Sequence, residues 1–397
     1  MASTAAAAPS AQDFSLVLGG PLFQLLRRAH LADDALELVR KRVLFIALFA
    51  WLPLLVLSLV QGKALGDAVR VPFLFDFELH IRFLVALPLL IIAELVVHSR
   101  MRPILQLFRE REVVPEALMP RFDAAVASAF RLRNSVVAEL SLVAFVYLVG
   151  IQFIWRNFIA LDTATWYATP AAGGTDLTIA GLWYGYVSLP LFQFLLVRWY
   201  FRIFIWSRFL WQVSRLELSL IPSHPDKLGG LGFLGGIAYA FMPLAAAHGA
   251  LSAGTCANRI FYAGAHLTDF KAELALLVVL VQILVFAPLL VFAPQLAATR
   301  RRGTREFGTL AERYVREFDT KWFRGKPPQE PLLGSADIQS LADLANAHEG
   351  VRTMRTVPIS RDAMVRLAAA TLAPLVPLGL TMMPLEELLK KLFGLLF

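Results

Sequence analysis

The stretch Ile221–Gly236, IPSHPDKLGGLGFLGG, holds the densest group of residues whose types suit binding chemistry. Its polar side chains and first glycines are His224, Asp226, Lys227, Gly229 and Gly230. A glycine-rich chain that opens a helix can present backbone N–H groups to an anion. It is not a P-loop, because the lysine precedes the glycines and no GK[ST] follows. The alternative is structural: Pro222 and Pro225 end one helix, Asp226 caps the next, and the glycines allow close helix packing.

Ionisable residues within apolar stretches form a second candidate site, a polar path through a membrane. They are Glu94, His98, Glu139 and Glu273. Such groups are rare at membrane depth and often line a pathway or carry protons. Glu94 and His98 share one helix face, which would also suit two metal ligands, but a metal site needs more donors. The alternative is ion pairing of Glu94 and Glu139 with nearby arginines, namely Arg100, Arg102, Arg131 and Arg133.

Other polar groups give weaker indications. A charged cluster of Asp76, Glu78, His80 and Arg82 precedes the second apolar stretch. His80, His248 and His266 are expected to be hydrogen-bonded packing groups. The spacing of donors predicts no metal site, the single Cys256 excludes an internal disulfide, and no catalytic signature is present, so we assign no catalytic residue, metal or cofactor.

Four arginines follow the fourth apolar stretch among many aromatic residues: Arg198, Arg202, Arg208 and Arg215. We expect an interfacial helix whose arginines extend to lipid phosphates. A voltage sensor carries arginine at every third residue, and the spacings here are 4, 6 and 7.

The elements that position these residues are membrane helices. The chain is 57% hydrophobic and only 17% charged, whereas soluble domains are about 45–50% apolar and about 25% charged. The apolar residues gather in runs of about 20, the length that crosses a bilayer. We predict an all-α, polytopic transmembrane bundle of about seven spans: 43–61, 83–97, 136–155, 177–197, 231–253, 272–293 and 364–383. Prolines within most of them predict kinks that favour a transporter or channel over a simple anchor.

Charge predicts the orientation. The segments 1–42, 98–135, 198–228 and 297–366 hold 5, 7, 5 and 13 lysines and arginines, which is 30 of the 38 in the chain. Basic loops stay in the cytoplasm. We therefore expect a cytoplasmic N-terminus and an outward C-terminus, unless Pro374, Pro377 and Pro384 turn the last span into a re-entrant hairpin.

Four regions follow from this topology. Residues 1–42 form a cytoplasmic tail with an interfacial helix, and 43–298 hold the first six spans. Residues 299–361 form a cytoplasmic helical segment with a break at Gly325–Pro331 and a second helix capped by Ser335. We expect this segment to pack under the bundle. Residues 362–397 hold the seventh span and an amphipathic tail.

Three stretches look familiar: IPSHPDKLGGLGFLGG, then GSADIQSLADLANAHEGVRTMR at Gly334–Arg355, then PLEELLKKLF at Pro384–Phe393. They resemble a group of uncharacterised bacterial inner-membrane proteins of similar length. The resemblance implies a multi-pass protein of the bacterial cytoplasmic membrane, and it implies no activity or site residues.

The function that we expect is transport of a small solute or ion, as a transporter or channel. The alternative is a non-transporting membrane scaffold that binds a cytoplasmic partner or anionic lipid; an intramembrane enzyme is a distant third. The expected partners are the lipid bilayer, anionic lipids at the basic loops and, as an open alternative, further copies of the chain in a homo-oligomer. No recognition motif accompanies the net charge of +8, so we expect no nucleic acid.

Overall fold

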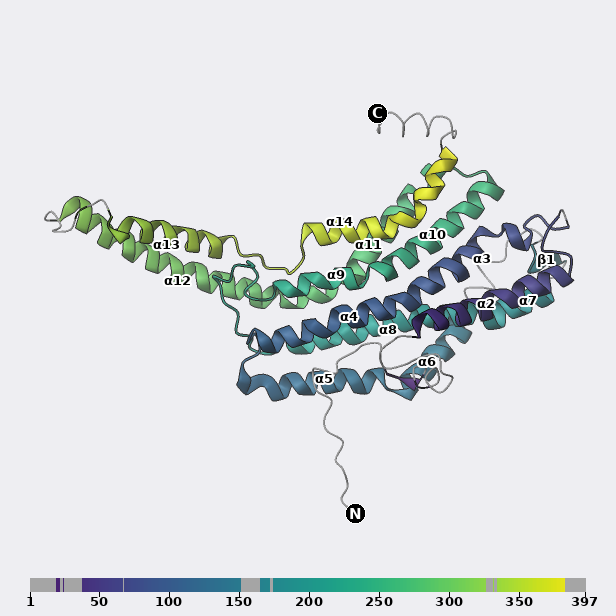
Figure 1. The fold of residues 1–397 in the computed structure, drawn as a ribbon, viewed down its shortest axis with the longest axis horizontal. Helices are drawn as coiled ribbons and strands as arrows, with labels where there is room; N and C mark the ends of the chain where they lie inside the picture. The colour runs from purple at the N-terminus through teal and green to yellow at the C-terminus, as the bar shows by residue number, and fades with distance from the viewer. Residues whose placement is uncertain are drawn as a thin grey trace, which may run out of the picture.

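The fold is an elongated bundle of long helices (Figure 1), described in a computed structural model. The structure describes residues 19–21, 24, 38–66, 68–150, 165–171, 174–325, 331 and 334–382. The predicted N-terminal interfacial helix and the amphipathic C-terminal tail lie almost entirely outside the described residues.

Helices account for nearly all of the regular structure. The first half contains α2 (Val39–Val60), η2 (Phe73–Phe75), α3 (Phe77–Ile81), η3 (Arg82–Ala86), α4 (Leu87–Glu110), η4 (Glu116–Leu118), α5 (Met119–Arg133) and α6 (Val136–Phe145). The middle contains β1 (Ala168–Ala171), β2 (Gly174–Leu177), α7 (Ile179–Trp183), η6 (Tyr184–Ser188) and α8 (Leu189–Val213). The last part contains η7 (Gly232–Gly236), α9 (Ile237–Ala240), α10 (Met242–Ala263), η8 (Leu267–Phe270), α11 (Lys271–Phe286), η9 (Ala287–Phe292), α12 (Ala293–Asp319), η10 (Thr320–Arg324), α13 (Ala336–Arg352), α14 (Arg361–Leu372) and η11 (Ala373–Met382).

The predicted all-α membrane bundle is confirmed. Within the described residues, six helical segments are long and apolar enough to cross a membrane: Val39–Val60, Phe77–Glu110, Ile179–Val213, Gly232–Ala263, Leu267–Arg324 and Arg361–Gly379. A bent pair, Glu116–Arg133 with Val136–Gly150, makes seven if it counts as one span. Large apolar side chains remain exposed on α2, α6 and α11, for example Leu44, Val137 and Leu280. Such a surface suits lipid, and it identifies a multi-pass membrane protein.

The bundle has two distinct ends (Figure 1). We call the end with the antiparallel β1–β2 hairpin, paired from Ala168 with Leu177, the hairpin end. The opposite end carries α5, the loop between α8 and η7 and the start of α12, and we call it the basic end, because most arginines lie there. The segment α3–α4 contacts α2, α8 and α10 and thus occupies the middle of the bundle.

The third span is bent, and the seventh ends in a 3-10 helix. The predicted third span, 136–155, begins with α6, and a bend of 48° separates α6 from α5, which packs on α8 and was expected in a cytoplasmic segment. The predicted end at 151–155 lies outside the described residues. The seventh, α14 with η11, begins beside α9 and reaches η8 at the hairpin end. As far as Met382 it crosses the bundle without turning back.

The longest helix runs without a break from Leu267 to Arg324, 58 residues. At 1.5 Å per residue it is about 87 Å long, and a bilayer core is about 30 Å thick. Its last part, α12 with η10, pairs with α13 as a helical hairpin, and Ser335 caps α13 as predicted. The expected packing of 299–361 under the bundle is wrong: only the base of this helical hairpin contacts the bundle, and the rest projects away (Figure 1).

Candidate functional site

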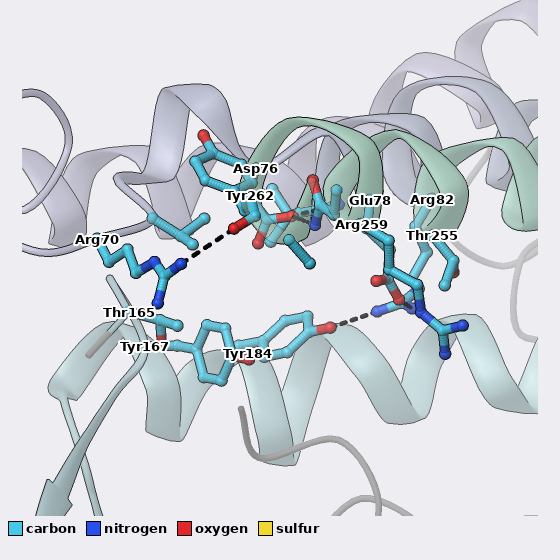
Figure 2. A pocket seen from close by; sticks show the side chains of 14 residues that line it. Arg70, Asp76, Glu78, Arg82, Thr165, Tyr167, Tyr184, Thr255, Arg259 and Tyr262 are labelled. Carbon is cyan, nitrogen blue, oxygen red and sulfur yellow. Dashed lines mark hydrogen bonds and ion pairs between the residues drawn. The ribbon is translucent and has the colours of Figure 1, made fainter. Parts of the chain in front are cut away.

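A polar cavity of about 460 Å³ opens at the hairpin end between three of the spans (Figure 2). Residues from the α3–η3 segment, from the approach to β1, from η6 and from α10 line it. The lining residues with polar side chains are Arg70, Asp76, Glu78, Arg82, Thr165, Tyr167, Tyr184, Thr255, Asn258, Arg259 and Tyr262. A cavity of this size with converging polar groups is the usual form of a small-molecule site.

Asp76 joins three elements at the wall of the cavity. Its Oδ1 accepts the Leu79 N–H at 3.1 Å, which caps α3, and the Asn258 amide N–H at 2.8 Å. Its Oδ2 accepts the indole N–H of Trp166 at 2.9 Å. Asp76 is buried, and these neutral donors satisfy the carboxylate without a cation.

Arg82 forms the floor of the cavity. Its guanidinium donates to Glu78, one helical turn earlier, and to the hydroxyl of Tyr184 on the facing span. Figure 2 shows Tyr167 and Tyr184 along one wall and Arg70 at the other end of the cavity from Arg82. The floor therefore links two spans through one buried cation.

Both residues of this link lie in π-helical turns. Arg82 opens the turn η3 and Tyr184 opens the turn η6, and a proline, Pro88 or Pro190, follows each turn. Proline lacks the N–H that would close a regular α-turn, so the helix widens before it. Widened turns of this kind occur frequently at functional sites.

Aromatic rings close the cavity toward the basic end. The ring of Phe83 lies 6.3 Å from those of Tyr184 and Phe192. Phe83 is fully buried, and Trp199 beyond it donates its indole N–H to the carbonyl of Leu90 at 2.9 Å. The described residues thus form a cavity that is open at one end.

Beyond this layer lies a buried ionic cluster that includes two of the predicted path residues. Glu94 contacts Arg42 at 2.5 Å, Arg202 at 2.7 Å and Arg198 at 3.3 Å. Arg198 also donates from Nε to Glu139 at 3.1 Å. All five side chains are at most 10% exposed. The cluster joins α2, α4, α6 and α8.

Two expectations about these charges are wrong. Glu94 pairs with Arg42, Arg198 and Arg202 instead of with the arginines of the neighbouring loop. Arg198 and Arg202 are buried and do not extend to lipid, because α8 continues to Val213 and places both, one turn apart, toward Glu94. In an apolar interior, arginine pairs with a buried carboxylate in preference to extending to lipid phosphates at the membrane surface.

The other predicted path residues lie elsewhere. His98 is half-buried one turn beyond Glu94 on α4. Glu273 lies at the hairpin end, is 62% exposed and contacts Arg259 at 3.4 Å. The four residues therefore do not form one continuous row. His80 accepts the indole N–H of Trp51 at 2.9 Å and His248 lies 2.7 Å from the Tyr200 hydroxyl, as expected of packing groups.

The glycine-rich loop is arranged around Asp226. Its carboxylate accepts the N–H groups of Leu228 at 2.7 Å, Gly230 at 3.2 Å and Gly232 at 2.8 Å. Nδ1 of His224 lies 2.8 Å from the same carboxylate. Burial alone would raise the pKa of Asp226, but these backbone N–H groups outweigh it and hold the pKa below its ordinary value. The N–H groups expected to bind an anion already have an acceptor.

Positive φ angles explain the glycines of this loop. Gly229 and Gly230 have φ of +63° and +99°, and Lys227 has φ of +55°. The Lys227 carbonyl accepts the N–H of Arg355 at 2.8 Å, so the loop is tied to the segment after α13. The geometry agrees in part with the structural alternative: Asp226 accepts the N–H of Gly232, the first residue of η7. However, α8 ends at Val213, before Pro222, and Gly229 and Gly230 form the turn itself.

The cavity combines residues that the sequence analysis had noticed with residues that it missed. Asp76, Glu78 and Arg82 were recognised as a charged cluster, whereas Arg70, Tyr184, Asn258 and Arg259 were not. A usable signal was the pair Asn258–Arg259, which interrupts a helix otherwise rich in glycine and alanine. In the comparisons with known proteins, no family model, curated protein or solved structure matches this chain. The described residues contain no group of three potential metal ligands.

Proposed function

We propose that the chain is a membrane transport protein for a small polar solute, and that the cavity at the hairpin end is its entry site. The cavity carries this proposal, because it lies among the ends of membrane spans and is lined by charged and tyrosine side chains. The positive-inside rule favours a cytoplasmic location of the basic end, and the resemblance noted above favours a bacterial cytoplasmic membrane.

Closure at one end supports transport by alternating access. The Phe83 layer separates the cavity from the Glu94 cluster, whose pairs join four helices. A carrier exposes its site to one side at a time, by movement of one group of helices against another. The link from Arg82 to Tyr184 joins two spans at the cavity floor, and such a contact has to rearrange before solute passes.

The test is flux into proteoliposomes, recorded by electrometry on a solid-supported membrane with a panel of small anions, cations and zwitterions. Tyr184→Phe removes the hydroxyl that Arg82 contacts and retains the ring. We expect flux to fall about tenfold, the value of one good polar contact. Tyr314→Phe on α12, whose hydroxyl donates to the Asp337 carbonyl, is the control and should leave flux unchanged.

Two outcomes would count against transport through this cavity. One is that no solute crosses faster than in protein-free liposomes, with the purified protein folded by size exclusion. The other is that flux persists and the Tyr184 variant transports as rapidly as wild type.

The alternative, a membrane scaffold, is favoured by a different observation. The helical hairpin of α12 and α13 projects from the bundle at the basic end and exposes Leu310, Val315 and Ile338. It would present a helical surface to a cytoplasmic protein, and the basic loops would contact anionic lipid. A variant in which a short linker replaces residues 305–350 separates the two functions. If the protein is a transporter, this variant should retain flux; if it is a scaffold, neither the variant nor the wild type should show flux.

A further inference from the structure

The lining of the cavity at the hairpin end has more basic than acidic side chains. Its lining holds three guanidinium groups, from Arg70, Arg82 and Arg259, and two carboxylates, Asp76 and Glu78. Both carboxylates already have partners: three neutral donors hold Asp76, and Arg82 binds Glu78. The cations therefore exceed the acids by one, and the acids are committed to the protein.

The remaining hydrogen-bonding capacity is mainly that of donors. A guanidinium has five N–H groups. Arg70 donates to the Tyr262 carbonyl at 3.1 Å, and Arg259 donates to Glu273 at 3.4 Å in a pair that is more than half exposed. An exposed pair of this kind contributes little energy and is easily exchanged. Arg70 and Arg259 thus have N–H groups left for a ligand that accepts hydrogen bonds.

The tyrosine wall adds a surface for an organic body. The rings of Tyr167 and Tyr184 lie 5.6 Å apart and belong to one row along the cavity (Figure 2). Inorganic phosphate would leave most of the 460 Å³ empty, whereas a molecule with a ring or short chain would contact these faces.

We propose that the cavity binds a small organic oxyanion, a carboxylate or a phosphate ester. Its charged group would bind Arg70 or Arg259, which lie toward opposite ends of the cavity (Figure 2), and its body would lie on the tyrosine wall. This inference rests on the proposed function for the site, and it adds the class of solute. Guanidinium groups suit both kinds of oxyanion, because their paired N–H groups match paired oxygens.

Isothermal titration calorimetry on the full-length protein in detergent tests the class directly. The probes are benzoate and phenyl phosphate, the neutral isostere benzamide and the cation benzylamine. We expect both anions to bind, and the neutral and cationic probes to bind at least about tenfold more weakly, as loss of a charge-assisted contact predicts. Comparison of benzoate with phenyl phosphate shows which oxyanion the cavity favours.

Variants locate the binding. Whichever of Arg70→Gln and Arg259→Gln removes the guanidinium that binds the charged group should weaken anion binding about tenfold, and the other should weaken it less. Both arginines are exposed, so the fold should persist. Arg313→Gln, whose side chain is 79% exposed on α12, is the matched control.

Three results would overturn this inference: benzamide or benzylamine binds as tightly as benzoate, the two glutamine variants bind like wild type, or no anionic probe binds. A failure of the oxyanion inference can be distinguished from a failure of the proposed transport function. Anion binding without any flux would reject transport and keep the oxyanion site, whereas flux of neutral or cationic solutes alone would do the reverse.

Discussion

At the scale of single residues, the carboxylates of Asp76, Glu94 and Asp226 differ in how far away in sequence their partners lie. Asp76 and Glu94 collect partners from other spans, whereas Asp226 binds the backbone of its own loop. The carboxylate of Asp226 fills the concave backbone that an external anion would otherwise enter. The loop therefore stabilises the connection between α8 and α10, and the carboxylate is the group that does so.

Asp226→Asn should reduce stability in a pH-dependent way. The side chain is only 17% exposed, so loss of its charge-assisted contacts should lower the free energy of unfolding by about 1–3 kcal/mol at pH 7. The folded-state pKa lies below the ordinary value. The stabilisation is therefore present above pH of about 4 and is lost as the pH falls through the folded-state pKa. Thermal unfolding in detergent, followed by tryptophan fluorescence, measures the difference.

The control for this comparison is Asp343→Asn, at an exposed position on α13, which should unfold like wild type at pH 7 and at pH 3. An Asp226→Asn variant as stable as wild type at pH 7 would mean that the backbone contacts carry no net stabilisation. An equal loss at pH 7 and at pH 3 would contradict the role of the charge.

Residue types were readable from the sequence, but partners were not. Glu94 and Glu139 were expected to pair with arginine, and they do, but both contact Arg198, which lies on another helix and far away in sequence. Hydropathy ended the fourth span at residue 197 because arginine there looks like a membrane boundary. A charge that is neutralised by another helix is invisible to a hydropathy window, and only tertiary contacts identify it.

At the scale of helices, close approach of backbones determines how the seventh span joins the bundle. A Cβ at Gly249 of α10 would lie 1.7 Å from the carbonyl oxygen of Thr371 on α14. Small residues at such crossings replace the hydrophobic driving force that lipid removes. The glycine and alanine content of α10 favours close packing, but the partner helix was not predictable from the sequence, because α14 follows about 110 residues later in the chain.

Gly249→Ala should separate α10 from α14. Because the added methyl group has no space, we expect the free energy of unfolding to fall by about 1–3 kcal/mol, the usual cost of overpacking. Gly236→Ala is the matched control, since a Cβ there would have no atom within 4 Å and should be tolerated. Thermal unfolding of both variants in the same detergent measures the effect, and identical midpoints would show that this crossing adapts without cost.

At the scale of the whole molecule, the two ends differ in what they offer. The hairpin end holds the open cavity and a short β-hairpin, while the basic end holds the Asp226 loop and the projecting helices α12 and α13. The position of six spans followed from hydropathy alone, since runs of about 20 apolar residues leave little choice, and the seventh depends on whether the bent pair of α5 and α6 counts as one span. The cavity was not predictable from hydropathy, because its lining comes from segments more than 180 residues apart that no local sequence pattern connects.

Orientation determines what the cavity can receive, and cysteine labelling in intact bacterial cells measures it. The native Cys256 is buried and should give little background. We expect Asp176→Cys, at the exposed β-hairpin, to react with a membrane-impermeant maleimide from outside. Arg324→Cys, at the far end of α12 and η10, should react only after the membrane is permeabilised. The reverse pattern would place the cavity on the cytoplasmic side, so that it would act in export or sensing of a cytoplasmic solute instead of uptake. Labelling of both positions in intact cells would contradict an odd number of crossings between them.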